Sequence, residues 1–558
     1  MTGSVLHSIR EGLTPEGVSY RDSFRSCGVG FSARMPGMVA TQVARETLPS
    51  IDPATGVVRA QFERTPATAV AGLVAGARVA QAEWAKRPVA ERCALIGKLK
   101  KTILERRDGL ADAVVRESGK PRVEALFADV FVSLDTAEYF AKQGRKLLRA
   151  ERVKHHSTAA KAKSGTLLYE PLGVVAIISS WNYPLAIPMS QIIPALAAGN
   201  GVVCKTSDFT PECGELIGEL FREAGFPADL VTMVQGGGEV GQALIEAHPD
   251  KVFFTGSVFT GKHVAEACAR HLLPSVLELG GKDAMLVLGD ADLDVASSAA
   301  VWGSYSNCGQ VCLSVERLFV EESVSEEFIR RCVEKTQKLR MGPGSDPGTE
   351  IGPLIRPQHV QRMNDLIAEA VGKGAKVVWG GRARPDLGAN FFEPTIITGV
   401  DGTMQLFQDE TFGPIMAIQV VKDAEEALAR ANDSEFALAA SVWTMDAGRG
   451  KEMARRLKAG TVMVNDVMSG FAIAEAPHGG CRLSGWGRAH GKAGLLEMVN
   501  VKYVDVDWLK GVEKPWWYRY GAELEKAAEA FLRFEFGGMG EKIRNGREAM
   551  KTMFRRHW

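Results

Sequence analysis

The sequence predicts an α/β protein with two parallel-sheet domains, and three observations lead to this prediction. The chain has 558 residues, which is more than one hydrophobic core usually holds. Short apolar runs rich in β-branched residues alternate with helical segments, a pattern typical of strand–helix–strand units. This alternation occurs twice, first from Gly173 and again from Glu278.

Two helices precede the first run of strands. The first is predicted over 65–88, because Thr65 is a capping residue and Pro66 suits the first helical position. The second is predicted over 91–107, where apolar residues recur near helical spacing.

The strands of both blocks are short apolar runs. In the first block they are 174–178, 202–204, 230–234 and 252–254, with helical segments such as ELIGELFREAG between them. In the second block AMLVL and RLFVEE are strands, SEEFIRRCVEKTQK is a helix, and the alternation continues to about residue 465. Short buried strands joined by helices form parallel sheets. We therefore expect two α/β domains with a cleft between them.

The chain from Leu509 onward has a different composition, with 11 Lys and Arg against 7 Glu. One helical face there is apolar and consists of Leu524, Ala527, Ala528, Phe531 and Leu532. Two interpretations are open. The helix docks on the body of the protein or on another subunit, or it lies on a membrane surface through its basic and aromatic residues.

Composition and charge argue against several functional classes. The 67 Lys and Arg balance 67 Asp and Glu, so no global charge favours a nucleic-acid partner. Nine cysteines form no CxxC pair and no Cys/His cluster with zinc spacing, so we expect no metal site and a reducing, cytoplasmic compartment. No apolar run approaches the ~18 residues that span a bilayer, and the first residues lack the apolar core of a secretory signal. Residues 1–44 show no periodicity, and we expect a loose arm there, with Met35 or Met38 as an alternative start.

Two glycine-containing turns are candidate phosphate sites. GGGEVG, from Gly236 to Gly241, follows a strand and opens a helix, as the dinucleotide fingerprint requires; an ordinary tight turn explains it equally well. FTGSVFTGK, from Phe254 to Lys262, ends a strand in Thr-Gly-Ser before a helix, so free N–H groups and the hydroxyl of Ser257 would face an anion. The alternative is an ordinary capped helix start.

Two further stretches place ionisable side chains at strand ends. CKTSD puts Lys205 and Asp208 after a buried strand, where ligands bind in open α/β sheets and a carboxylate suits ribose hydroxyls. LELGGK places Glu278 between two leucines, and desolvation there would raise its pKa toward that of a usable base. A solvated loop and a paired structural carboxylate are the respective alternatives.

Residues 307–320, NCGQVCLSVERLFV, place two cysteines four residues apart before a strand-like run. A buried strand that holds thiols and a catalytic nucleophile are both compatible with this stretch. Together with SSWNYP, LELGGK and DETFGP, however, it resembles the aldehyde dehydrogenase superfamily over about residues 45–508. Within that superfamily the chain most resembles a bacterial branch often labelled succinate-semialdehyde dehydrogenase, which shares the VCLSVERLFV style of run and a C-terminal extension.

The resemblance implies three catalytic residues. Cys312, two residues after Gly-Gln, matches the nucleophile, whereas Cys308 matches a packing position. Attack by a thiolate on an aldehyde gives a thiohemiacetal, whose oxyanion the Asn182 amide and the Cys312 backbone N–H would stabilise. Glu278 matches the base that activates water to hydrolyse the thioester, which favours a free carboxylic acid as product.

The resemblance also implies NAD as cofactor, with NADP possible. The matching residues are Trp181, Lys205, Asp208, Gly256, Ser257, Glu410 and Phe412. Lys205 and Asp208 match the adenosine ribose contacts, Ser257 the pyrophosphate contact and Glu410 the nicotinamide ribose contact. GGGEVG matches only a turn near the adenine. Asp208 replaces a common Glu and still repels a 2′-phosphate, so we expect NAD to be preferred.

The substrate tunnel is implied by position. Its residues match Tyr183, Ala186, Ser190, Val311 and Leu313, with Phe471 nearby. Succinate-semialdehyde enzymes with a known carboxylate clamp carry an arginine at the position of Ser190. The small side chains of Ala186 and Ser190 predict a wide, neutral tunnel for medium or long, apolar or aromatic aldehydes. His478 and Arg482 replace a common Phe and Lys, and neither departure carries a functional prediction.

The domain boundaries follow from the same resemblance. A dinucleotide-binding domain over 45–280 is interrupted by an oligomerisation hairpin at 151–170, and a catalytic domain covers 281–480. Residues 481–508 return to the small β oligomerisation element, and 509–558 form an amphipathic extension. The fold class is thus aldehyde dehydrogenase-like, and a homodimer or homotetramer is expected. Three alternatives remain: succinate-semialdehyde oxidation, transfer of the acyl group to coenzyme A, and a non-catalytic scaffold.

Overall fold

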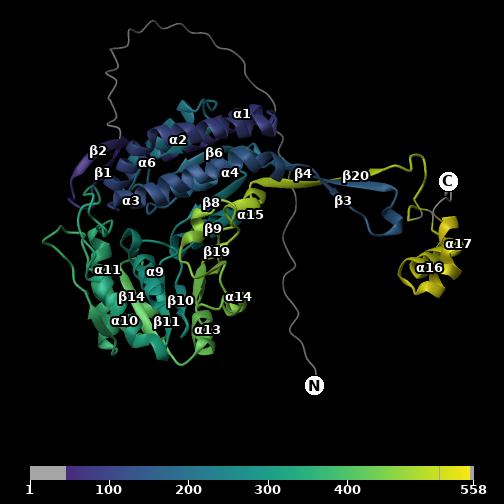
Figure 1. The fold of residues 1–558 in the computed structure, drawn as a ribbon. Coiled ribbons are helices and arrows are strands. Elements are labelled where there is room, and N and C mark those ends of the chain that lie inside the picture. Colours follow the sequence, from purple (N-terminus) through teal and green to yellow (C-terminus); the bar gives the residue numbers. More distant parts are fainter. Residues whose placement is uncertain (1–45, 515, 519, 553–558) are drawn as a thin grey trace, which may run out of the picture. The chain divides into compact units, whose positions relative to one another are not determined.

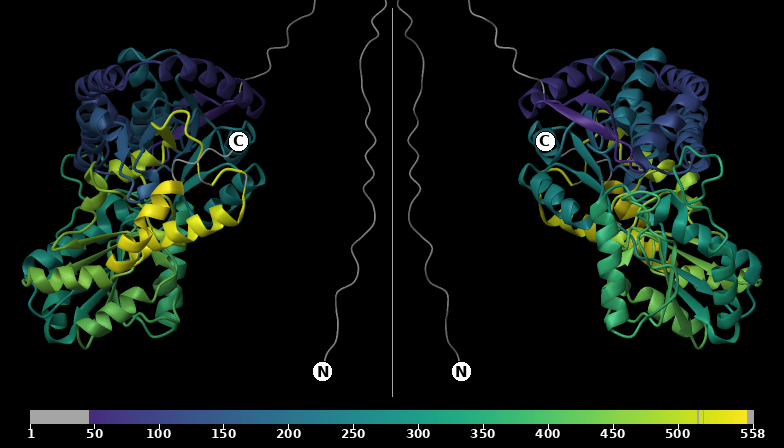
Figure 2. Two further views of the ribbon diagram at one scale, coloured as in Figure 1. Left: turned by 90° about the vertical axis from the view of Figure 1, so that its right-hand side faces the viewer. Right: turned by 90° about the vertical axis from the view of Figure 1, so that its left-hand side faces the viewer.

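The computed structural model describes residues 46–514, 516–518 and 520–552. The predicted loose arm of residues 1–44 and the end of the predicted extension, 553–558, lie outside the described residues. Two sheets with helices on their faces make up most of the described chain, and they confirm the predicted α/β class (Figure 1). The side views in Figure 2 place the purple and blue helices of the first sheet and the green helices of the second at opposite ends.

The first sheet has six strands in the order β19-β9-β8-β5-β6-β7. Its strands are β5 (Val174–Ile178), β6 (Gly201–Lys205), β7 (Val231–Val234), β8 (Lys251–Thr255), β9 (Ser275–Glu278) and β19 (Gly485–Trp486). All pairings are parallel except that of β19 with β9. Each predicted strand of this block is therefore confirmed, and β19 returns from the far end of the chain to close the edge at Glu278.

Residues of β5 alternate between two cores because the side chains of a strand point to opposite faces. Val175 and Ile177 pack with α2 (Val89–Ser118), α4 (Phe131–Leu147), α5 (Ala186–Ala198) and α6 (Pro211–Glu223). Val174, Ala176 and Ile178 pack with α1 (Val70–Ala85), α7 (Gly238–Glu246) and α8 (Val258–Arg270). Burial on both faces explains why these strands read as continuous apolar runs.

The second sheet has seven strands in the order β12-β13-β14-β11-β10-β16-β17. Its strands are β10 (Asp283–Val287), β11 (Val315–Glu321), β12 (Lys376–Trp379), β13 (Thr395–Thr398), β14 (Ile415–Val421), β16 (Ala439–Trp443) and β17 (Thr461–Val464). One face packs on α9 (Leu293–Tyr305), α10 (Glu322–Thr336) and α11 (Pro357–Gly372), the other on α13 (Ala424–Asn432) and α14 (Ala447–Arg456). Only the edge strand β12 is antiparallel to its neighbour.

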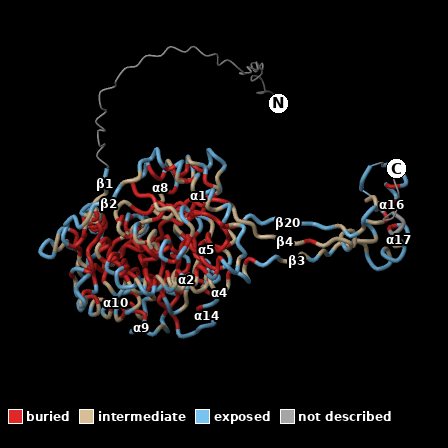
Figure 3. The backbone as a smooth tube through the Cα atoms, turned by 90° about the horizontal axis from the view of Figure 1, so that it is seen from above, coloured by how far each residue is buried: buried red, intermediate tan, exposed pale blue. Residues whose placement is uncertain are grey.

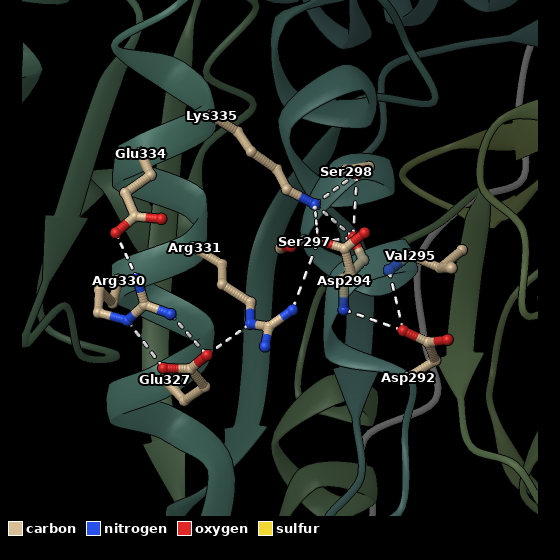
Figure 4. Close-up of polar contacts among 10 residues, drawn as sticks. All are labelled: Asp292, Asp294, Val295, Ser297, Ser298, Glu327, Arg330, Arg331, Glu334 and Lys335. Atoms are coloured by element: carbon tan, nitrogen blue, oxygen red, sulfur yellow. Dashed lines mark hydrogen bonds and ion pairs between the residues drawn. The ribbon is translucent and has the colours of Figure 1, made fainter.

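Exposed polar pairs join α9 and α10 (Figure 4). The carboxylate of Asp292 accepts from the N–H groups of Asp294 and Val295 and so caps α9. Lys335 Nζ on α10 donates to Asp294 Oδ1 over 2.9 Å. Such solvent-exposed pairs contribute little to stability, so the apolar core beneath them determines how these helices pack.

The prediction that Thr65 caps the first helix is wrong. α1 begins at Val70, after a 3-10 turn at Ala67–Ala69. Thr65 Oγ1 instead accepts from the Gln235 N–H over 2.9 Å, and the Thr65 N–H donates to the Gln235 carbonyl over 2.8 Å. The Thr65 hydroxyl therefore accepts from the backbone after β7 instead of capping a helix, and the helix starts later.

A smaller sheet joins two distant segments. β20 (Val499–Asp507) pairs antiparallel with β4 (Lys163–Pro171), which also pairs with β3 (Glu151–Val153). Figure 3 shows these strands in pale blue and tan beside the red, buried body. β20 is the edge strand, and seven of its nine residues are exposed.

Two C-terminal helices, α16 (Ala522–Phe536) and α17 (Met539–Thr552), pack near the tip of this sheet. Glu535 accepts from the N–H of Thr158 over 2.9 Å and also from its hydroxyl. A mostly apolar cavity of about 830 Å³ lies between α16, the 157–162 turn, residues 507–514 and residues 516, 520 and 521. Among the described residues, no helix has the length and apolar character needed to cross a bilayer.

Candidate active site

Three loops meet at the carboxyl end of β9, and two glycines let them approach. A Cβ on Gly280 would lie 2.4 Å from Glu410 Oε2, and a Cβ on Gly281 would lie 2.3 Å from the Cys312 carbonyl oxygen. Any side chain at either position would displace these residues. The two glycines of LELGGK are therefore explained by close packing of the Cys312 and Glu410 loops.

The loop that carries Cys312 has a constrained backbone. Asn307, Cys308 and Gly309 have φ angles of 51°, 55° and 72°, in the left-handed region that non-glycine residues seldom adopt. A Cβ on Gly309 would lie 2.1 Å from the Gly413 carbonyl oxygen. The partly buried carboxylate of Glu124 accepts from the Asn307 N–H over 2.8 Å and fixes the start of this loop.

Cys312 lies between two buried apolar residues, Val311 and Leu313, and is itself only partly buried. Desolvation raises the pKa of its thiol, and the carboxyls of Glu410 and Glu278 act in the same direction. The thiol is therefore protonated at neutral pH in this environment. Cys308 is fully buried, which raises the pKa of its thiol as well.

Asn182 faces the same loop from the first sheet. Its Nδ2 donates to the Gln310 carbonyl over 3.1 Å, and its Oδ1 accepts from the Ser180 hydroxyl over 2.8 Å. The Asn182 carbonyl accepts from Lys120 Nζ over 2.7 Å and from Asn307 Nδ2 over 3.1 Å. The amide has two N–H bonds, so one remains for a ligand.

An ion pair that sequence reasoning did not identify lies behind Asn182. Lys120 and Asp129 are fully buried, and Lys120 Nζ lies 2.8 Å from Asp129 Oδ2. Asp129 Oδ1 also accepts from the N–H groups of Leu185 and Ala186 at the start of α5. Lys120 follows α2 in an ordinary Ser-Gly-Lys-Pro turn, and no pattern in the sequence pairs it with Asp129.

The surroundings of Glu278 are the opposite of those of the Lys120–Asp129 pair. It is buried, and neither carboxyl oxygen has a hydrogen-bond partner among the described residues. Burial raises the pKa of Glu278 well above its ordinary value; nearby Arg488 opposes this shift and Glu497 adds to it. His478 Nε2 lies 3.7 Å from Glu278 Oε2. A raised pKa makes the ionised form of this carboxyl a stronger base toward a ligand or water.

Glu410 is held by a second buried pair that the sequence did not reveal. Glu316 accepts from Lys282 Nζ over 2.6 Å and from the N–H groups of Thr411 and Phe412. These bonds fix the DETFGP loop against β11. Desolvation and the nearby Glu316 raise the pKa of Glu410 to about 8, although the Gly281 N–H donates to it over 3.2 Å.

Other residues expected to contact the cofactor lie at the end of β6 and in the loops after β5 and β6 and before β14. The ring centroids of Trp181 and Phe412 lie 5.5 Å apart, edge to face. Lys205 is buried, and its Nζ donates to the Thr206 carbonyl over 3.1 Å. Burial lowers the pKa of Lys205, and the nearby carboxylates of Asp208 and Glu239 oppose this.

The two glycine-containing turns differ at their helix starts. α7, which opens in GGGEVG, is occupied by its own Glu239, which accepts from the Gly237 N–H over 3.0 Å and pairs with Arg64 at 2.5 Å. At α8, after Gly256, the exposed Ser257 accepts from the Thr260 N–H over 3.2 Å, and within the described part of the chain no carboxylate is seen to bond this cap. Lys205, the carboxylates of Asp208 and Glu410, and the start of α8 are groups whose chemistry fits a dinucleotide.

Most of the residues expected to line a tunnel lie in one apolar cluster. Tyr183, Ala186, Val311 and Leu313 belong to it, and Phe471 packs against it. Ser190 is buried, but its hydroxyl donates to the Ile187 carbonyl of its own helix over 2.8 Å. Among the residues described, no group of three or more His, Cys, Asp or Glu is arranged to hold a metal ion.

Comparison with known proteins gives a consistent result. The aldehyde dehydrogenase family model matches residues 39–504. A protein of Mycolicibacterium smegmatis named putative succinate-semialdehyde dehydrogenase (NADP+) is 39% identical over 490 residues, 87% of this chain and 93% of that protein. The 4,4′-diapolycopene aldehyde oxidase of a Methylomonas species is 34% identical over 508 residues, 91% of this chain and 95% of that protein.

Solved structures agree. The NAD-dependent aldehyde dehydrogenase of Sinorhizobium meliloti is 34% identical with a TM-score of 0.81, covering 85% of this chain and 93% of that one. The NAD+ complex of the Bacillus cereus aldehyde dehydrogenase is 35% identical with a TM-score of 0.79, covering 83% and 93%.

Proposed function

The chain belongs to the aldehyde dehydrogenase family, and from this premise we propose that it oxidises an aldehyde to a free carboxylic acid by hydrolysis of a thioester on Cys312. The family assignment makes it an NAD(P)-dependent oxidoreductase. The observation that carries the hydrolytic part is the buried carboxyl of Glu278, which has no hydrogen-bond partner among the described residues and whose charge, when ionised, raises the pKa of the Cys312 thiol.

The chain's own groups act before and after the transfer of hydride. Cys312 attacks the aldehyde as a thiolate, after its thiol proton has passed to solvent water. The free N–H of the Asn182 amide and the Cys312 backbone N–H stabilise the oxyanion. The bound nicotinamide cofactor supplies the hydride acceptor. Glu278 in its ionised form then takes a proton from the water that cleaves the thioester and passes it to the departing Cys312 sulfur, which releases the acid and restores the thiol.

Rapid mixing separates these steps. Glu278→Gln should retain a stoichiometric burst of NADH, because hydride leaves before hydrolysis, while steady-state turnover falls ~100-fold or more. Cys312→Ser should show neither burst nor turnover. A Glu278→Gln enzyme that turns over normally would exclude this base, and acyl-CoA formed on addition of coenzyme A would favour the acyl-transfer alternative.

We propose that the substrates are medium or long, apolar or aromatic aldehydes. The apolar cluster of Tyr183, Ala186, Val311 and Leu313 supports this, as does the absence of an arginine at Ser190. Lys120 lies 3.8 Å from the Tyr183 ring centre, but Asp129 neutralises it, so it offers no free charge to an anionic substrate. The relative named for diapolycopene aldehyde favours a long apolar substrate, whereas those named for succinate semialdehyde favour the alternative.

The test is NADH formation across straight-chain aldehydes of increasing length, with succinate semialdehyde included. We expect kcat/KM to rise with chain length. A tenfold or greater preference for succinate semialdehyde over a neutral aldehyde of similar length would reverse the assignment.

We propose that NAD is preferred over NADP. Asp208 would repel a 2′-phosphate, and the neighbouring cations are engaged elsewhere: Arg64 pairs with Glu239, and Arg356 lies 3.4 Å from the Phe209 ring centre. The NADP+ in the names of several relatives argues the other way. The ratio of kcat/KM for NAD and NADP tests this preference. If the Asp208 carboxylate repels the 2′-phosphate, Asp208→Ala should raise kcat/KM for NADP relative to that for NAD.

We propose that subunits pair through the exposed edge of β20, as a homodimer or homotetramer. For the extension we propose contact with an anionic lipid surface, with docking on the body or on another subunit as the alternative. Exposed apolar and aromatic side chains of the extension favour the lipid contact: Trp516, Trp517, Tyr518, Tyr520, Leu532, Phe536, Met539 and Ile543. Aromatic and basic residues together suit the interface between lipid and water.

Co-sedimentation with vesicles of anionic or neutral phospholipid tests the lipid contact. Trp517→Ser with Phe536→Ser should reduce binding to anionic vesicles, while Val79→Ser with Leu272→Ser, which are at least as exposed elsewhere on the protein, should not. Binding that survives deletion of residues 509–558 would refute the lipid contact. Light scattering of the same proteins without vesicles gives the oligomeric state.

A further inference from the structure

Two buried histidines pack together, and one of them, His478, lies beside the carboxyl group of Glu278. The ring centroids of His478 and His490 are 5.9 Å apart, and Phe471 contacts both rings, at 5.0 Å and 4.7 Å. The backbones of His478 and Ala489 exchange hydrogen bonds of 2.9 Å and 2.8 Å. This bridge fixes the position of His478 next to β19 and β9 independently of its imidazole.

The side chain of His478 places a ring nitrogen close to Glu278. Its Nε2 lies 3.7 Å from Oε2, just beyond a hydrogen bond. Arg488 contributes charge, but its Nη1 donates to the carbonyls of Gly480 and Gly487. On the other side, a Cβ at Gly479 would lie 2.8 Å from Oε1, so glycine there leaves the carboxyl room to move.

The protonation state of His478 follows from its surroundings. Burial lowers the pKa of His478 to about 3, and His490 and Arg488 act in the same direction. Burial also lowers the pKa of His490 to about 4. Both rings are therefore neutral at pH 7. His478 Nδ1 is buried and has no partner among the described residues, and an unsatisfied N–H there would cost more than a bare nitrogen. The proton is best placed on Nε2, which faces Glu278.

We propose that His478 is a positioning residue that donates its Nε2–H to the ionised Glu278 carboxylate and holds it toward the thioester on Cys312. This rests on the proposed role of Glu278 as the hydrolytic base. A donor to the charged form favours ionisation, which offsets the desolvation that otherwise keeps Glu278 protonated. The small closing movement, from 3.7 Å to bonding distance, occurs when Glu278 ionises.

The test is the pH profile of the hydrolytic step. His478→Phe keeps the aromatic contact with Phe471 and removes the donor. We expect the acidic limb of steady-state kcat to move about one pH unit toward alkaline pH, a tenfold loss of active base below that limb. The NADH burst should be unchanged, and His478→Gln, which retains an N–H donor, should restore most of the shift.

A matched control separates this effect from general repacking. His490→Phe removes an equally buried imidazole from the same cluster without removing the donor beside Glu278, so its acidic limb should stay within 0.3 pH units or so of wild type. The groups that face Glu278 and its histidine neighbour, namely Arg488, Glu497, Cys312 and His490, are otherwise unchanged in His478→Phe.

Two outcomes would overturn the proposal. An unchanged limb in His478→Phe removes the donor role, and a shift toward acidic pH means that protonated Glu278 donates to His478 instead. Both are distinguishable from failure of the proposed function, because Glu278→Gln then still stalls after the burst. If Glu278→Gln turns over normally, the base itself is wrong.

Discussion

The two sides of Cys312 are constructed in opposite ways. On the amide side, defined by Lys120, Asp129, Asn182 and Asn307, the side-chain nitrogens and oxygens meet partners at hydrogen-bond distance. On the carboxyl side, defined by Glu278, His478 and His490, buried polar atoms have none among the described residues.

The difference matches the chemistry proposed for each side. Donors that stabilise an oxyanion act best when they are fixed before the reaction, so that no reorganisation is needed. A base must exchange a proton with a water molecule, so its carboxyl needs space for that water and a pKa raised toward the working pH. The amide side should therefore contribute to stability, and the carboxyl side should reduce it.

The largest expected effect is on the amide side. Lys120→Met should lower the free energy of unfolding by about 3–5 kcal/mol, because it leaves the Asp129 carboxylate buried without its cation. Urea denaturation measures this. Lys120→Met combined with Asp129→Asn should lose less than Lys120→Met alone, since the buried charge is gone. A loss below about 1 kcal/mol in the single variant would show that the amide side is not a stabilising unit.

The next effect concerns rate. Asn182→Ala should lower kcat/KM by about 100- to 1000-fold, the usual loss for one oxyanion donor. Ser180→Ala removes only the hydroxyl that donates to Asn182 Oδ1, so its loss should stay below about tenfold. Steady-state NADH formation compares the two. Equal losses would mean that the position of the amide, and not its N–H, determines the rate.

A third effect tests the carboxyl side through pH. The pKa of Glu278 is raised in the folded protein, so the native state keeps a proton that the unfolded state loses above its ordinary pKa of about 4.3. The stability contribution of this group is thus complete below that pH and is lost as pH rises. Glu278→Gln does not titrate, so its stability advantage should grow from pH 5 to pH 8, by at most about 1.4 kcal/mol per pH unit.

Denaturation of both proteins at pH 5, 6.5 and 8 gives the required difference. Other buried acids, such as Glu117, whose pKa burial raises to about 7, titrate equally in both proteins and cancel. If the difference in unfolding free energy between the two proteins stays constant with pH, Glu278 is already ionised in the resting protein, and the carboxyl side does not reduce stability in this way.

The sequence predicted the elements of these sides unequally. Strands buried on both faces read as apolar runs, and Cys312, Asn182 and Glu278 stand in motifs whose order is specific, so the fold and these three candidates were accessible. Their roles stay predictions until tested. The ion pairs Lys120–Asp129 and Lys282–Glu316 were not predicted, because each joins residues that only the tertiary fold brings together and buries.

His478 illustrates the same limit. The sequence marks it as a departure from a common phenylalanine, but its meaning depends on the distance to Glu278 and on the burial of both groups. GGGEVG shows the reverse error. A motif can match by letters while its helix start is already filled by its own side chain, here Glu239.

The smallest effect separates glycines required by packing from glycines that merely complete a motif. A Cβ on Gly241 would meet Lys205 Cδ at 3.7 Å, an ordinary contact, and alanine within a helix is favoured by about 0.5–1 kcal/mol. Gly241→Ala should therefore stabilise the protein slightly. Because there is room for the added methyl group and we assign no phosphate contact to this turn, KM for NAD should stay within about twofold of wild type. Gly281→Ala, at the seam between the two sides, must displace the Cys312 carbonyl and should lower kcat at least tenfold. If Gly241→Ala instead impairs NAD binding, the GGGEVG turn contacts the cofactor, and the two helix starts would have to be reassigned.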